Sequence, residues 1–176
     1  IAIDVGHGGN DPGKVVGDVL EKNINLEIAL LVREELLERN IAVILTRESD
    51  TALYDENAKN KKTSDMKNRC ELINASNANV MISIHQNSYE SSSVKGAQVF
   101  YCKGSDEGKS LATCIQTSIR EMVDSENTRI EKASDGYYLL KNVKMPSVIV
   151  ECGFLTNATE REKLLSKDYQ KKIAEA

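Results

Sequence analysis

The sequence has little of several features, and each shortage argues against a class of protein. It contains only two histidines and four cysteines among its 176 residues. No two cysteines form a C-x-x-C pair, which argues against a zinc knuckle or a redox-active dithiol. No apolar run approaches the roughly 20 residues that a membrane-spanning helix needs. The net charge of −4 offers no basic surface, so we expect no nucleic-acid partner.

The composition and length of the chain are typical of one globular domain. The chain is 40% apolar and 28% charged, and its length is sufficient for a sizeable core. We expect the cysteines to be free and mostly buried thiols, although their even number leaves disulfides open; they are Cys70, Cys102, Cys114 and Cys152. The chain begins at Ile1 without a methionine and stops inside an apparent helix, so we expect both ends to be trimmed and a targeting segment to lie outside this chain.

Apolar strands alternate with helical patterns along the chain. Strands are expected at 1–5, 41–47, 80–86, 96–102 and 147–154. Helices are expected at 24–40, 66–76, 106–123 and after Asn157, with a long polar loop over 48–65. Alternation of this kind predicts an α/β fold, a single domain in which helices cover both faces of a mostly parallel central sheet.

Three chemically useful side chains follow apolar strands. His7 stands among glycines just after the first strand, His85 closes `VMISIH`, and Glu151 closes `SVIVE`. If these strands are parallel, the three side chains meet at one edge of the sheet, where ligands bind in open α/β folds. A buried carboxylate such as Glu151 needs a cation, a metal or a raised pKa.

Each residue alone has an ordinary structural explanation. A histidine at a strand end is more often a hydrogen-bonded structural residue. Glu21 opens the first helix, where the helix dipole stabilises any acidic residue. Together, however, two histidines and a carboxylate with an open coordination position form a standard catalytic zinc set, and one zinc site explains them more economically than separate structural roles.

Four ordered motifs carry a resemblance to a known family. `DVGHGGNDPG`, `EKNINLEIA`, `SIHQNS` and `PSVIVECGFLTN` span nearly the whole chain. They resemble the zinc-dependent N-acetylmuramoyl-L-alanine amidases of the amidase_3 type. The region `RCELINASNANVMISIHQNS` and the compact layout are most similar to the CwlD-like, germination-specific branch of spore-forming bacteria.

The resemblance implies a role for each matching residue. It places the zinc ligands at His7, Glu21 and His85 and the catalytic glutamate at Glu151. It also implies that Asn87 holds substrate or supports the metal ligands. Arg69, on the helix before `VMISIH`, is a further candidate for substrate binding, although a salt-bridged structural role is the commoner one for arginine.

The expected reaction is hydrolysis of the amide between N-acetylmuramic acid and L-Ala in peptidoglycan, in maturation of the spore cortex or elsewhere in the wall. Zn²⁺ would polarise the carbonyl and activate water, while Glu151 would carry a proton to the departing amine. Two alternatives stay open: a zinc peptidase cutting peptidoglycan peptides, and a non-catalytic wall-binding domain. We expect a monomeric catalytic domain that acts outside the cytoplasm, secreted or membrane-anchored, in the cell wall or the spore intermembrane space, with an accessory protein as a potential partner.

Overall fold

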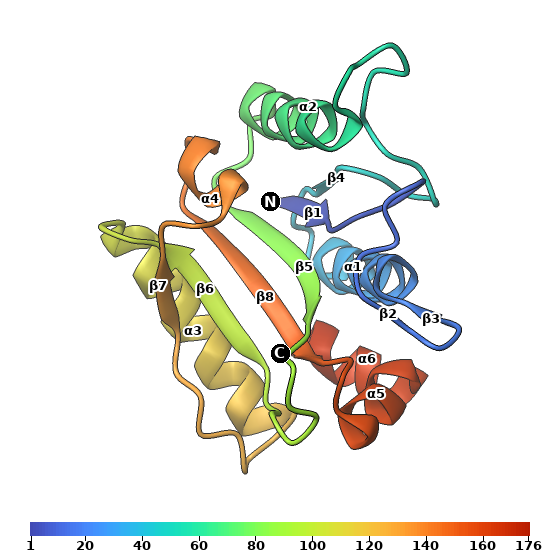
Figure 1. Ribbon diagram of the computed structural model, residues 1–176. Coiled ribbons are helices and arrows are strands. Elements are labelled where there is room, and N and C mark those ends of the chain that lie inside the picture. Colours follow the sequence, from blue (N-terminus) through green and yellow to red (C-terminus); the bar gives the residue numbers. More distant parts are fainter.

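Buried strands form a six-stranded sheet through the centre of the molecule (Figure 1). The computed structural model describes residues 1–176. The strands of the sheet are β1 (Ala2–Val5), β4 (Ile44–Leu45), β5 (Met81–Asn87), β6 (Gln98–Cys102), β7 (Lys132–Ser134) and β8 (Ser147–Phe154). A small separate hairpin joins β2 (Val15–Val16) to β3 (Val19–Leu20).

The strand order in the sheet is β4-β1-β5-β8-β6-β7. Strands β4, β1, β5 and β8 run parallel to one another, whereas β6 is antiparallel to β8 and parallel to β7. The prediction of a mostly parallel sheet in one α/β domain is therefore confirmed. The three strands that carry or precede His7, His85 and Glu151 all belong to the parallel part, so their carboxyl ends share one edge.

Helices cover both faces of the sheet, as predicted (Figure 1). They are α1 (Glu21–Glu38), α2 (Lys61–Ala75), α3 (Asp106–Met122), α4 (Tyr138–Asn142), α5 (Ala158–Leu165) and α6 (Lys167–Glu175). The larger core cluster joins α1, α3, α5 and α6 to one face. A smaller cluster joins α2 and α4 to the other face, through residues such as Ile73 and Leu139.

Alternation along β8 decides which side chains reach each face. All eight residues of β8 are buried, which explains its continuous apolar pattern. Val148 and Val150 pack into the larger core, whereas Ile149 packs with Leu140 of α4. Glu151 follows Val150 and therefore projects from the face that α2 and α4 cover.

Several element boundaries differ from the prediction. Helix α2 begins at Lys61, not at residue 66, because the side chain of Asn60 accepts a hydrogen bond from the backbone N–H of Thr63 and caps the helix. The expected loop over 48–65 is shorter for the same reason. The expected strand over 41–47 is reduced to β4, because only Ile44 and Leu45 have partners on the short β1.

The remaining expectations concern cysteines and membranes. All four cysteines are free thiols, as predicted, but only Cys70 and Cys152 are buried, and Cys114 is exposed. None of the helices combines the length and the apolarity that crossing a membrane requires.

Candidate active site

The structure brings the predicted site residues into one cleft of about 440 Å³ between α2 and α4. His85 and Glu151 are register partners on β5 and β8, so both project from the same face of the sheet. The sequence predicted both at strand ends, but they lie inside their strands, because β5 continues to Asn87 and β8 to Phe154. His7 lies two residues beyond the end of β1 and lines the same cleft.

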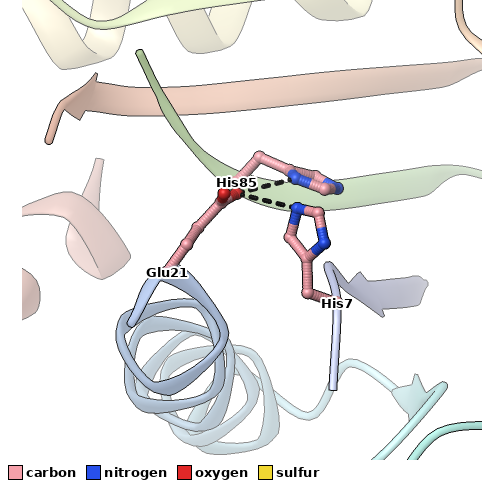
Figure 2. A group of neighbouring side chains, drawn as sticks. All are labelled: His7, Glu21 and His85. Carbon is pink, nitrogen blue, oxygen red and sulfur yellow. Dashed lines mark hydrogen bonds and ion pairs between the residues drawn. The ribbon is translucent and has the colours of Figure 1, made fainter. Parts of the chain in front are cut away.

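His7, Glu21 and His85 converge from three elements that are distant in the sequence (Figure 2). Nε2 of His7 lies 3.2 Å from Oε1 of Glu21, and Nδ1 of His85 lies 3.0 Å from the same oxygen. One donor atom from each residue lies within 4.8 Å of the other two. Two imidazoles and one carboxylate are the donor set of many catalytic zinc sites, so these residues fit a zinc ion.

The carboxylate of Glu21 is held by several donors. Its Oε2 accepts a hydrogen bond from the backbone N–H of Lys14 at 2.8 Å, and its Oε1 accepts one from the backbone N–H of Gln86 at 3.0 Å. Burial alone would raise the pKa of Glu21, but the hydrogen bonds from His7 and His85 outweigh it and leave the pKa well below its usual range. Glu21 is therefore a preformed anion at the centre of the site.

Asp11 is a site residue that the sequence analysis did not name. Its Oδ2 lies 2.9 Å from Nδ1 of His7 and so orients the ring with Nε2 toward Glu21. Such a partner fixes the tautomer of a metal-binding imidazole. The available signal was the position of Asp11 in `GNDPG`, four residues after His7.

The backbone at His7 adopts a left-handed conformation that non-glycine residues seldom take. Its φ is 61°. Two buried arginines hold this loop through its carbonyl groups. Arg47 donates from Nε to the carbonyl of His7 at 2.8 Å and from a terminal nitrogen to that of Gly6 at 3.1 Å, and Arg69 donates to the carbonyls of Val5 and His7 at 3.1 and 2.7 Å. These bonds compensate for the local backbone strain.

The surroundings of Arg69 favour one of its two expected roles. Arg69 is 3% exposed at the base of the cleft, and its guanidinium also pairs with Asp4 at 3.3 Å and Asp65 at 2.7 Å. Burial lowers the pKa of Arg69, but the charges of Asp4 and Asp65 outweigh this effect and raise it. Asp4, Asp65 and the carbonyl groups of Val5 and His7 occupy most of the N–H groups of Arg69. Arg69 is therefore suited to holding the His7 loop, which agrees with the salt-bridged structural role that the sequence analysis gave as the commoner alternative.

Replacing Arg69 by methionine is expected to lower the free energy of unfolding by about 3–5 kcal/mol, because Asp4 is then left buried without its cation. Urea denaturation would measure the loss. Lys67→Met is the matched control on the same helix: Lys67 is exposed and pairs with Glu71 only at 3.6 Å, so a change of less than about 0.5 kcal/mol is expected. Similar losses in both variants would contradict the buried pairing.

A second prediction concerns the crowding around His7 and Glu21, two of the three clustered residues that fit a zinc ion. A Cβ at Gly13 would lie 2.6 Å from Oε2 of Glu21 and 2.7 Å from Cδ2 of His7. Gly13→Ala is therefore expected to displace both side chains and to weaken zinc binding, measured by titration calorimetry. Gly17→Ala is the control: its φ of 58° is similar to the 67° of Gly13, but a Cβ there meets nothing within 4 Å. Both variants share a strain of about 1–2 kcal/mol, so equal zinc affinities would rule out the crowding.

Glu151 and Asn87 line the cleft beside the three clustered residues. Glu151 is buried, and its Oε2 has no hydrogen-bond partner within the protein. Burial, reinforced by the negative charge of Glu21, raises the pKa of Glu151 in spite of the nearby histidines. Asn87 is half-buried, and its Oδ1 accepts a hydrogen bond from the backbone N–H of Ser88. Tyr137, which the sequence analysis did not name, also lines the cleft.

Comparison with known proteins identifies the family. The family model described as Amidase_3, N-acetylmuramoyl-L-alanine amidase, matches residues 1–176. The chain belongs to the N-acetylmuramoyl-L-alanine amidase family. Like other members, it is an enzyme that hydrolyses the amide between N-acetylmuramic acid and L-Ala in peptidoglycan, as the sequence predicted. The match favours the amidase over the peptidase and the non-catalytic wall-binding domain.

Individual amidases are similar over almost the whole chain. The germination-specific N-acetylmuramoyl-L-alanine amidase of Bacillus subtilis (strain 168) is 42% identical over 99% of this chain and 74% of its own length. The CwlD amidase of Clostridioides difficile, solved in complex with the GerS lipoprotein, is 45% identical, with a TM-score of 0.95 over 98% of this chain and 91% of that one. An N-acetylmuramoyl-L-alanine amidase of Clostridium difficile 630 is 32% identical, with a TM-score of 0.85 over 99% of this chain and 89% of its own. The resemblance to the germination-specific branch is thereby confirmed.

Proposed function

We propose that this amidase is zinc-dependent and that His7, Glu21 and His85 hold the ion. The observation that carries the proposal is the convergence of their donor atoms within 4.8 Å of one another. The ionised state of Glu21 and the orientation of His7 by Asp11 support it, because metal ligands must be deprotonated at the binding atom. When bound, zinc would polarise the scissile carbonyl and lower the pKa of water.

Glu151 is the proposed proton carrier of the reaction. An amide is cleaved only if its nitrogen leaves as a neutral amine, so a group near the bond must deliver a proton to it. Glu151 lines the cleft beside the three proposed ligands but is not one of them, and its Oε2 has no partner in the protein. It would accept a proton from the attacking water and donate it to the nitrogen of L-Ala. Its raised pKa suits this role, because a base works best when its pKa approaches the working pH.

Substrate would lie along the cleft between α2 and α4. We propose that Asn87 hydrogen-bonds the substrate from the end of β5, because its half-buried amide lines the cleft beside His85. For Arg69 we propose a positioning role in place of substrate binding, since its guanidinium holds the carbonyl groups of Val5 and His7.

The biological setting is proposed from the relatives. Similarity to a germination-specific amidase supports action on spore cortex, and peptidoglycan as substrate supports a location outside the cytoplasm. The similar CwlD amidase forms a complex with the GerS lipoprotein, which supports an accessory protein for this chain as well.

Mass spectrometry of digested peptidoglycan tests the function. Purified cortex and vegetative peptidoglycan would each be incubated with the protein, with a chelator, and with the chelator followed by added zinc. Stem peptides with free L-Ala amino termini are expected from cortex, and they should disappear with the chelator and return with zinc. Cleavage inside the stem peptide with the muramic acid–L-Ala bond intact would contradict the proposal, and preference for vegetative peptidoglycan would contradict the cortex role.

A further inference from the structure

We propose that Tyr137 is a positioning residue for Glu151: its phenolic hydroxyl donates a hydrogen bond to Oε1 and so directs the other carboxylate oxygen to the proton transfer. The inference rests on the proposed role of Glu151 and adds a residue to it. The two oxygens of Glu151 differ in their surroundings. Oε1 lies 3.5 Å from the hydroxyl oxygen of Tyr137, whereas Oε2 has no partner.

Tyr137 is the only hydrogen-bond donor that the protein offers to the side-chain carboxylate of Glu151. The residue beside Glu151 on β6, its register partner Gln98, uses its side chain to contact Ile130 and Arg129 instead. Without this hydrogen bond the carboxylate would be poorly fixed, because rotation about its last torsion angle is only weakly restrained. Hydrogen bonds of this kind are often long in ligand-free enzymes and shorten in the substrate complex.

The ring of Tyr137 is held in place by packing. It lies against the ring of Phe100, with centroids 5.3 Å apart and planes at 57°, at the border of the cluster of Phe100, Leu140 and Ile149. Tyr137 immediately precedes α4, and Gly136 before it also lines the cleft. Because a tyrosine side chain has only two rotatable bonds, a fixed ring leaves its hydroxyl at a nearly fixed point in the cleft.

The hydroxyl is a donor under working conditions. Burial, followed by the negative charge of Glu151, raises the pKa of Tyr137 above its usual value, so the phenol keeps its proton at neutral pH. A neutral donor to one carboxylate oxygen leaves the other as the acceptor for a proton from water. Only the orientation of Glu151 depends on this contact, since Tyr137 is not among the clustered zinc-binding candidates.

The neighbouring Tyr138 provides a matched control. It lines the same cleft and is 43% exposed, but it makes no hydrogen bond to Glu151. Tyr137→Phe and Tyr138→Phe each remove one oxygen atom and keep the ring. If the hydroxyl groups of both tyrosines only contact substrate, the two variants should show similar changes in kcat and KM.

Steady-state kinetics on a defined N-acetylmuramoyl-peptide test the inference, with zinc content and unfolding temperature measured alongside. Tyr137→Phe is expected to lower kcat about 10- to 100-fold, the range for loss of a hydrogen bond to a charged group. KM should change less than about twofold, and zinc content and unfolding temperature should remain those of the wild type. Tyr138→Phe should retain more of the wild-type kcat than Tyr137→Phe, because Tyr138 makes no hydrogen bond to Glu151. Tyr89→Phe, at an exposed tyrosine that does not line the cleft, should keep the wild-type kcat.

Two results would overturn the inference. One is an unchanged kcat in Tyr137→Phe; the other is a raised KM with unchanged kcat, which would make Tyr137 a substrate contact. A failure of the proposed function is distinguishable, because it would be seen in the wild-type protein as the absence of zinc-dependent release of peptides with L-Ala termini.

Discussion

Glu151→Gln is expected to lower kcat about 10²- to 10⁴-fold while zinc stays bound, because glutamine has the shape of glutamate but cannot carry the proton. Bulk water cannot efficiently carry the proton in place of Glu151, because the residue is only 7% exposed. Its carboxylate accepts a hydrogen bond only from Tyr137. Release of peptides from peptidoglycan and elemental analysis of the purified variant would measure both properties.

Glu90→Gln is a suitable control for this variant. Glu90 is exposed and takes part in no hydrogen bond or ion pair, so its replacement should leave kcat unchanged. Wild-type turnover in Glu151→Gln would exclude Glu151 as the proton carrier of the reaction. Loss of zinc in that variant would instead place Glu151 among the metal ligands.

Glu21→Gln is expected to lower zinc affinity by more than about 100-fold. Replacing even an outer partner of a metal ligand typically costs 10- to 100-fold in affinity, and Glu21 is proposed to bind the ion directly. Its Oε1 is also the common neighbour of the nitrogens of His7 and His85, so the site loses its only central negative charge. Titration calorimetry would measure the affinity.

The unfolding temperature offers an independent measurement of the same change. A ligand at 100 times its Kd stabilises a protein by about 2.7 kcal/mol, so added zinc should raise the unfolding temperature of the wild type but not of Glu21→Gln. Glu34→Gln, an exposed change on the same helix, should respond to zinc like the wild type. An undiminished response in Glu21→Gln would exclude Glu21 as a ligand.

Much of the site could be predicted because its residues lie in strong local patterns. The apolar runs before His7 and His85 predict buried strands, and parallel buried strands bring the residues at their carboxyl ends to one edge of the sheet. These patterns singled out His7, His85 and Glu151, and the family resemblance added Glu21 as a ligand, without any coordinates. The bounds of β8 were also predicted, and those of β5 to within one residue, whereas the strand expected over 41–47 is reduced to β4.

Contacts between side chains far apart in the sequence could not be predicted in this way. Arg47 and Arg69 lie 40 and 62 positions from His7, yet both donate to its carbonyl. The sequence leaves Arg69 with either a substrate contact or a salt-bridged structural role, because no periodic pattern separates an arginine with buried partners from a free one. The approach of Tyr137 to Glu151 depends likewise on how the segment before α4 crosses the sheet.

The sequence by itself determined the α/β class, the apolar strands and the chemical types available at one edge of the sheet, because periodicity and burial are local properties of the chain. Only the tertiary structure decided the antiparallel direction of β6, the arginine contacts that hold the His7 loop, and the pairing of Tyr137 with Glu151. These features arise from loop paths and long-range hydrogen bonds, whose geometry exists only once the whole chain has folded.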